Sequence, residues 1–285
     1  MIGPVHRAHL LLFLACASLA ATTSTAAVAA DASAWDEDQR SSARLVAASA
    51  HNVSGVKTFR AGIEIKLKDG WHTYWRYPGD SGVPPVFDFS KSENVKRAEV
   101  RYPAPQKFPD GAGGQSIGYV GDVIWPIDVV PADPAKPALL HVALDYAVCE
   151  KLCVPAKANL ELAVTGGPSA ADANVRAAEA RVPREAKIGD EGPLAVRAVR
   201  REAGKDKPRV VVDVAAAGPV TLFAEGPTVQ WALPLPAPVA GAPAGQQRFA
   251  FDLDGLPPGE TGQGATLRLT AIAGDKAIEV GFRLD

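Results

Sequence analysis

Short runs in which hydrophobic and polar residues alternate recur along the whole chain, and they predict β-strands. The clearest run covers residues 61–67, where apolar side chains occupy every second position and charged ones stand between them. The turn Lys68-Asp69-Gly70 follows at once. Because 26 Gly and 24 Pro interrupt such runs along the chain and heptad repeats are absent from the sequence, the pattern favours an all-β fold of the sandwich type.

The same pattern predicts strands in both halves of the sequence. In the first half they are expected at 42–49, 61–67, 95–102, 117–130, 138–148 and 159–164. In the second half they are expected at 194–200, 209–215, 220–224, 229–233, 247–253, 265–272 and 277–284. Two Pro-rich or Gly-rich segments, 104–115 and 234–245, are predicted to be loops. The first of these is long, and long loops inside compact domains often carry function.

The N-terminus has the features of an export signal. An apolar stretch is followed by small residues as far as Ala30, so residues 1–30 are predicted to be a cleaved signal peptide and the protein to be periplasmic. Residues 31–41 are expected to be a disordered leader. The formal net charge of −2, with both signs interspersed, argues against nucleic-acid binding.

The remaining chain is long enough for two domains. The sequence predicts two tandem immunoglobulin-like β-sandwich domains, at 42–168 and 191–285, joined by a short linker helix within 169–190. The linker is Ala-rich and begins with Ser169-x-x-Asp172, which is typical of a helix N-terminus. The second domain has neither Cys nor His, so thiol and imidazole chemistry is expected only in the first.

Cys149 and Cys153 are the two cysteines of the predicted mature chain. In a fully extended strand their Cα atoms would lie roughly 13 Å apart. A disulfide needs about 4.4–6.8 Å, so the segment must turn, either as a helical turn or as the tip of a hairpin. A bond that closes so small a loop removes little chain entropy, and it is therefore a weak structural staple. The pair is better suited to redox chemistry or to metal binding.

Two alternatives to a redox role stay open at this point. The two thiolates with His51, His72 or His141 could bind Cu(I) or Zn, although these histidines are scattered along the sequence. The pair could also be an inert disulfide in a structural interaction domain. On the strand that leads to the cysteines, the polar face carries His141 and Asp145, which are candidates for proton transfer.

Three blocks of the first domain together resemble a known family. They are GWHTYWRYPGDSGVPP at 70–85, IGY at 117–119 and DYAVCEKLCVP at 145–155. In this order they look like the N-terminal periplasmic domain of DsbD-type thiol:disulfide interchange proteins, in the branch that includes ScsB. The resemblance covers roughly residues 42–164.

This resemblance implies an immunoglobulin-like sandwich whose catalytic pair, Cys149 and Cys153, shuttles electrons by thiol–disulfide exchange. It implies a cap loop near residues 108–114, with Phe108 and Asp110 shielding the pair. It also implies a membrane electron-transfer protein as donor, periplasmic thioredoxin-like proteins as acceptors, and no cofactor. Because the sequence ends at Asp285 without a multi-span membrane segment, we expect the donor to be a separate protein.

Overall fold

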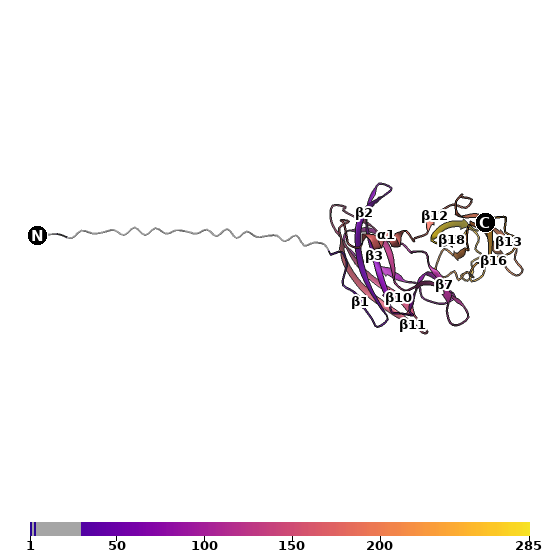
Figure 1. The fold of residues 1–285 in the computed structure, drawn as a ribbon, viewed down its shortest axis with the longest axis horizontal. Helices are drawn as coiled ribbons and strands as arrows, with labels where there is room; N and C mark the ends of the chain where they lie inside the picture. Colours follow the sequence, from indigo (N-terminus) through magenta and orange to yellow (C-terminus); the bar gives the residue numbers. More distant parts are fainter. Residues whose placement is uncertain (2, 4–29) are drawn as a thin grey trace.

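The computed structural model describes residues 1, 3 and 30–285, and it is an all-β protein with one short helix, α1 (Asp172–Glu179) (Figure 1). The predicted signal peptide lies almost entirely outside these residues. Within the described part of the chain, no helix is long and apolar enough to cross a membrane.

Two sheets form the N-terminal part. The first has the order β1 (Asp36–Glu37), β2 (Ser41–Val53), β3 (Val56–Leu67), β9 (Val123–Pro131) and β6 (Val95–Val100). The second has the order β11 (Cys153–Val164), β10 (Ala138–Cys149), β4 (His72–Gly79), β8 (Gln115–Val120) and β7 (Gln106–Pro109), with β5 (Val86–Asp88) also paired to β10. They share one core, to which β10 contributes every second side chain, as the alternation predicts.

Two further sheets form the C-terminal part and enclose a second core. One has the order β12 (Arg184–Glu185), β19 (Lys276–Arg283), β18 (Thr266–Ala273) and β15 (Thr221–Glu225); the other has the order β13 (Leu194–Glu202), β14 (Arg209–Ala216), β17 (Gln246–Asp252) and β16 (Ala237–Val239). The prediction of a strand at 229–233 is wrong, because Trp231 and Leu233 are buried from an irregular loop. The short strand β16 lies instead in the segment predicted to be a loop.

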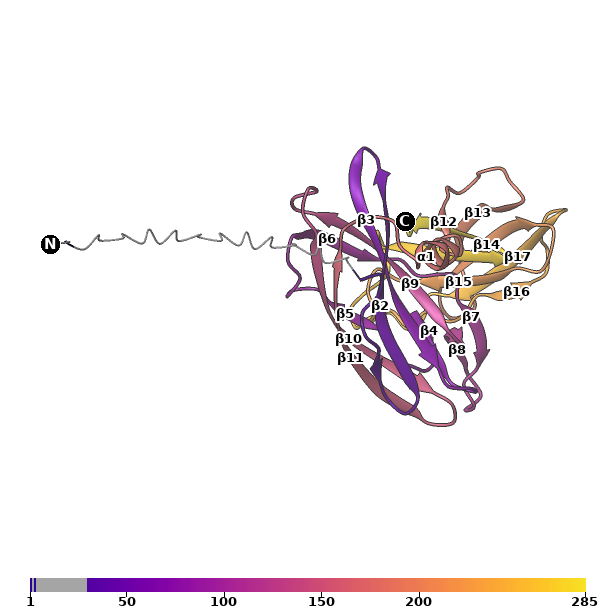
Figure 2. The ribbon, with the colours of Figure 1, turned by 60° about the vertical axis from the view of Figure 1, so that its left-hand side comes forward.

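The two parts of the structure lie next to each other (Figure 2), and side chains of β4 contact the C-terminal part. The ring of Trp75 in β4 lies 5.7 Å from the ring of Phe223 in β15, measured between centroids. Phe223 is fully buried and belongs to the first core rather than the second. The hydroxyl of Tyr77 donates to the carbonyl of Leu233 at 2.7 Å. The C-terminal part is therefore packed directly against a central strand of the second sheet.

The predicted disordered leader instead follows β2. The amide of Ser33 donates to the Leu45 carbonyl, and the amide of Ala47 donates to the Asp31 carbonyl. The Trp35 ring lies under the Arg44 guanidinium, 4.3 Å away. This differs from the prediction because the outer edge of β2 offers backbone groups that a passing segment can satisfy, whatever its own composition.

The helix α1 is shorter than the predicted linker of 169–190, and side chains fix it to the first sheet. The Asp172 carboxylate accepts hydrogen bonds from the amides of Ser169 (3.0 Å) and Ser49 (2.6 Å). At the other end of the helix, Arg60 of β3 makes a two-pronged ion pair with Glu179, at 2.7 and 2.6 Å. Polar contacts to β2 and β3 thus hold a helix that is too short to be stable alone.

Candidate functional site

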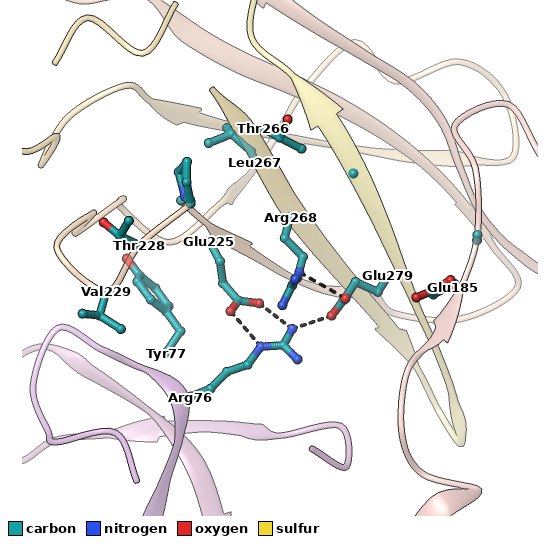
Figure 3. Close-up of a pocket in the computed structure, with 14 residues that line it drawn as sticks. Arg76, Tyr77, Glu185, Glu225, Thr228, Val229, Thr266, Leu267, Arg268 and Glu279 are labelled. Carbon is teal, nitrogen blue, oxygen red and sulfur yellow. Dashed lines mark hydrogen bonds and ion pairs between the residues drawn. The ribbon is translucent and has the colours of Figure 1, made fainter. Parts of the chain in front are cut away.

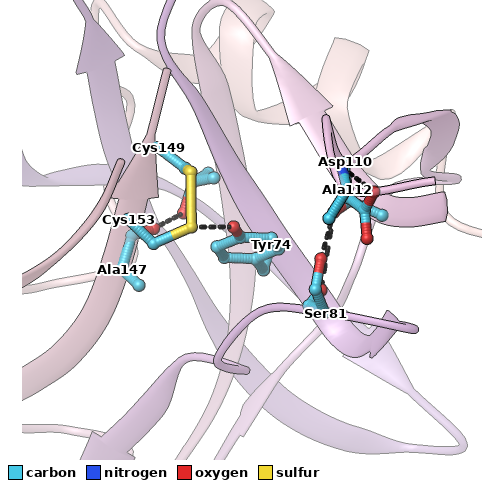
Figure 4. The surroundings of a disulfide bond; sticks show 9 residues. Tyr74, Ser81, Asp110, Ala112, Ala147, Cys149 and Cys153 are labelled. Atoms are coloured by element: carbon cyan, nitrogen blue, oxygen red, sulfur yellow. Dashed lines mark hydrogen bonds between the residues drawn. A yellow bond between two sulfur atoms is a disulfide. The ribbon is translucent and has the colours of Figure 1, made fainter. Parts of the chain in front are cut away.

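The two cysteines close a long β-hairpin. Strands β10 and β11 pair without interruption from Ala138 opposite Val164 to Cys149 opposite Cys153. Residues 150–152 form the connection. The two cysteine Cα atoms are 4.1 Å apart, and the sulfurs form a disulfide (Figure 4). Of the two turns that the sequence left open, the structure adopts the hairpin tip.

The two sulfurs differ in how far a partner could reach them. Cys149 is only 6% exposed, because β10 lies inside the sheet and Tyr74 and Ala147 cover its outer face. Cys153 is exposed, because it begins β11, the edge strand. The neighbouring Leu152 is 74% exposed. A second protein approaching the hairpin tip would therefore meet Cys153 before Cys149.

A buried tyrosine contacts the exposed cysteine. The hydroxyl of Tyr74 in β4 lies 2.9 Å from Sγ of Cys153, and Tyr74 is only 1% exposed (Figure 4). Burial, together with the nearby charge of Asp110, raises the pKa of this phenol above its usual value. The phenol therefore keeps its proton at neutral pH and can donate a hydrogen bond to sulfur.

A row of four residues crosses the sheet at the level of the disulfide. Cys153 pairs with Cys149, Cys149 pairs with His72 of β4, and His72 pairs with Val120 of β8. Residues directly opposite each other in an antiparallel pair have Cβ atoms about 4.5–5.5 Å apart and share a face. His72 and Cys149 are thus immediate neighbours on the outer face of this sheet.

The imidazole of His72 lies between aromatic rings. Its centroid is 4.5 Å from the ring of Phe108 and 5.5 Å from the ring of Tyr74. Burial by these neighbours lowers the pKa of His72 below its ordinary value, so the neutral, proton-accepting form is favoured at neutral pH. The chain thereby holds a neutral imidazole beside the buried cysteine.

The two residues predicted to shield the pair lie in the β7–β8 hairpin. Phe108 is partly buried and covers His72. Asp110 shapes the hairpin tip, because its carboxylate accepts hydrogen bonds from the amides of Ala112 (2.8 Å) and Gly114 (2.9 Å). These bonds lower the pKa of the carboxyl group. The predicted loop at 104–115 is thus an ordered hairpin whose aromatic residue packs beside the site.

The structure does not bring the other two predicted residues to the disulfide. His141 pairs with Glu161 at 3.2 Å, and Asp145 pairs with Lys157 at 2.5 Å. By the rise of a strand, Asp145 lies roughly 13 Å and His141 roughly 26 Å along β10 from Cys149. Their proton-transfer role stays a prediction from the sequence. His72 and Tyr74 stand closer to the sulfurs. Sequence analysis named His72 only as a possible metal ligand and included Tyr74 only in the block at 70–85.

No metal-binding cluster is present among residues 30–285, since the structure nowhere gathers three or more His, Cys, Asp or Glu side chains there. The histidines named with the copper and zinc alternative lie apart. His51 pairs with Asp128 of β9 at 3.3 Å, whereas His141 pairs with Glu161 of β11. Of the three histidines, His72 is the one beside a cysteine.

The N-terminal part of this chain thus carries a disulfide at a hairpin tip, on the outer face of a β-sandwich. Residues 42–165 match the family model described as thiol:disulfide interchange protein DsbD, N-terminal. The matched residues include all three motifs on which the sequence resemblance rests.

The fold is similar to a solved structure, the crystal structure of the N-terminal periplasmic domain of ScsB from Proteus mirabilis. The TM-score is 0.69 at 20% sequence identity, and the match covers 90% of this chain and 98% of that chain. The likeness in fold therefore extends well beyond residue 165, into the C-terminal sheets. Comparison with curated proteins gave no match.

Proposed function

We propose that this chain is a periplasmic redox module that relays electrons through Cys149 and Cys153. It accepts them from a membrane electron-transfer protein and passes them to periplasmic thioredoxin-like proteins. The observation that carries the proposal is the asymmetry of the pair. Cys153 is an exposed residue whose sulfur is hydrogen-bonded to a buried phenol, and Cys149 is buried. Exchange through a mixed disulfide needs one such accessible thiol and one resolving thiol.

The oxidative half-reaction begins at Cys153. Its thiolate attacks one sulfur of the acceptor's disulfide, so that a mixed disulfide forms and the second acceptor sulfur leaves as a thiolate. Cys149 then loses its proton and attacks Sγ of Cys153. This forms the Cys149–Cys153 disulfide and releases the first acceptor sulfur as a thiolate. Two electrons have passed to the acceptor, which takes up two protons to become a dithiol.

We assign supporting roles to two neighbours of the pair. Tyr74 donates a hydrogen bond to the sulfur of Cys153, and a thiolate accepts such a bond more strongly than a neutral sulfur does. His72, directly opposite Cys149, takes the proton that Cys149 must lose before it can attack. Phe108 covers the imidazole and limits the access of water to it.

The reductive half-reaction runs in the opposite sense. A thiolate of the membrane donor attacks Sγ of Cys153 and displaces Cys149 as a thiolate, which regains its proton from His72. The donor's second thiolate then attacks its own sulfur in the mixed disulfide, and Cys153 leaves as a thiolate. Donor and acceptor thus use the same exposed sulfur at different times.

The proposal includes the organisation predicted from the sequence. The signal peptide at 1–30 is removed near Ala30, which leaves the protein in the periplasm. The two pairs of sheets act as tandem immunoglobulin-like domains, the first of which carries the redox pair. The segment that contains α1 joins them.

A trapping experiment tests the relay. The mature Cys149→Ser variant keeps the exposed thiol and lacks the resolving one, so with an oxidised thioredoxin-like protein it should accumulate a mixed disulfide through Cys153. The matched Cys153→Ser variant keeps only the covered thiol and should trap little. Equal trapping by both variants, or none by either, contradicts the assignment.

The reduction potential gives an independent test. Equilibration of the wild-type pair with glutathione should give a reversible value between roughly −180 and −270 mV, the range of exchange proteins. A pair that stays oxidised below about −300 mV would be a structural disulfide, and the relay would be excluded.

A further inference from the structure

Arg76 of β4 joins the two parts of the structure through a partly buried ion-pair network. Its guanidinium makes two hydrogen bonds to the Glu225 carboxylate, both at 2.8 Å, and a further short contact to Glu279 (Figure 3). Glu225 ends β15 and Glu279 lies in β19, so both carboxylates belong to the C-terminal sheets. Arg268 completes the network by pairing with Glu279 at 3.2 Å.

The network lies in the wall of a cavity of about 620 Å³ between the two parts (Figure 3). This space is open rather than filled by side chains, so beside it Arg76 is held by its ion pairs. The Arg76 side chain is 19% exposed and the Glu225 side chain 10%, and ion pairs this well covered are screened weakly by salt. The directed contacts of Arg76 therefore restrain β4 where packing is incomplete.

The residues of β4 that contact the C-terminal part directly follow Tyr74 in the sequence. Tyr74 contacts the Cys153 sulfur, and the next three residues of β4 all contact the C-terminal part. Trp75 packs on Phe223, Arg76 pairs with two glutamates, and Tyr77 donates to the Leu233 carbonyl. Pairing of β4 with β8 is regular at Tyr74 and shifts register between Tyr74 and Gly79. Where this pairing is interrupted, the side-chain contacts with the C-terminal part add to the restraint on β4.

We infer that the C-terminal sheets are a positioning domain for the redox site, and that Arg76 is the positioning residue through which they act on Tyr74 and Cys153. This inference rests on the proposed function and deepens it, since it gives the domain that has no cysteine a part in thiol exchange. Arg76 does not touch the sulfurs, and its effect passes along two residues of β4.

The direction of the effect follows from the hydrogen bond of Tyr74. When β4 is held, the phenol stays within reach of the Cys153 sulfur and stabilises the thiolate of the reduced protein more than the disulfide. When Arg76 is lost, the strand relaxes and this stabilisation weakens. Cys153 should then react more slowly, and the reduced form should become less favoured relative to the disulfide.

The test compares Arg76→Gln with Arg60→Gln in the full mature chain. Arg60 is a matched control, because it makes an equally two-pronged ion pair with Glu179 on the opposite sheet, far from the cysteines. Both variants should lower the melting temperature. Only Arg76→Gln should slow alkylation of Cys153 by iodoacetamide near pH 7, by about threefold to tenfold. It should also move the pH midpoint of that reaction upward.

The ratio of dithiol to disulfide at equilibrium with glutathione gives a second readout. A purely structural role of Arg76 would not change this ratio. Arg76→Gln should shift it toward the disulfide, whereas Arg60→Gln should leave it at the wild-type value. If both variants match wild type in alkylation and in equilibrium, or shift by the same factor, the positioning role is overturned. Glu225→Gln keeps the shape of the network and weakens its charge, so it serves if Arg76→Gln does not fold, with the same direction expected.

Failure of this inference can be told apart from failure of the relay. The relay is judged on wild-type protein, by trapping through Cys153 and by a reversible potential. The positioning role is judged only on differences between the variants. A wild-type protein that exchanges thiols normally, together with an Arg76 variant that does so equally well, would overturn the positioning role and leave the relay intact.

Discussion

The hydroxyl of Tyr74 lies 2.9 Å from the sulfur of Cys153, although the two residues are 79 positions apart in the chain. The contact joins a side chain that is almost fully covered to a cysteine that is exposed. It forms because β4 pairs with the end of β10, and β10 pairs with β11, so the outer faces of all three strands converge at the hairpin tip. The chemistry of the pair therefore depends on long-range strand register.

Removal of this hydroxyl should make Cys153 less reactive. In Tyr74→Phe the thiolate loses a charge-assisted hydrogen bond, which is worth about 1.5–3 kcal/mol. Iodoacetamide should then alkylate Cys153 about tenfold more slowly near pH 7. Tyr146→Phe is the control, since its hydroxyl is bonded to Ser41, 2.8 Å away in another strand. Equal rates in wild type and Tyr74→Phe would show that the contact has no chemical role.

A change that adds one methyl group beside Tyr74 should have a similar effect. A Cβ atom at Gly82 would lie 2.3 Å from the Tyr74 ring, at a backbone φ of +123°. Gly82→Ala should therefore displace the phenol and slow alkylation of Cys153. Gly111→Ala controls for backbone strain alone, because its φ is +81° and a Cβ there would meet no atom within 4 Å. If both alanine variants behave alike, displacement of the ring is not the cause.

The rate at which Cys149 attacks the mixed disulfide and releases the partner should depend on the protonation of His72. Burial lowers the pKa of His72, so its neutral form should persist somewhat below pH 6.5, and release of a preformed mixed disulfide should slow only on further acidification. The groups that face the imidazole are the Cys149 sulfur across the strand pair, the Tyr74 phenol and the Phe108 ring.

Substitution should remove that pH dependence. In His72→Gln, release of the partner from the mixed disulfide should be slower at neutral pH by roughly a hundredfold, with a flat profile on the acidic side. His141→Gln, on the same sheet but paired with Glu161, should keep the wild-type profile. If His141→Gln were the slow variant with the flat profile, and His72→Gln kept the wild-type profile, the sequence-based assignment of proton transfer to His141 would be supported instead. Stopped-flow measurement of partner release checks both.

The exposed leucine at the hairpin tip should matter for partners and not for folding. Leu152 is 74% exposed and directly precedes Cys153. Leu152→Ser should change the free energy of unfolding by no more than about 0.5 kcal/mol. It should nevertheless slow formation of the mixed disulfide with a thioredoxin-like protein several-fold. Val229→Ser, at a similarly exposed site in the C-terminal part, should leave that rate unchanged. Equal exchange rates in all three proteins would exclude an apolar docking contact at Leu152.

Local sequence patterns were sufficient for the strand that carries the pair. Alternation from Leu140 to Val148 places the core side chains of β10 correctly, and the change of face then puts Cys149 on the outside. The spacing of the cysteines required a turn, and the hairpin satisfies it. These properties depend on residues close together in the chain, which is why a single sequence reveals them.

The side chains that surround the two cysteines could not be predicted in the same way. His141 shares a strand with Cys149 and therefore stood out, whereas His72 reaches Cys149 only through the pairing of β4 with β10. The segment around Trp231 was mispredicted for a related reason. Its pattern is strand-like, and Trp231 is buried, but the segment forms no strand. Register and loop packing depend on contacts across the whole fold, and hydrophobic periodicity does not encode them.

The position of Phe223 bears on where this protein can be divided. The family match ends at residue 165, yet Phe223 packs on Trp75 inside the first core. A fragment cut at residue 165 would lose that ring and leave the indole of Trp75 open to water, along with the guanidinium that its glutamates now neutralise. The segment that matches the family model therefore ends before a residue that completes its own core.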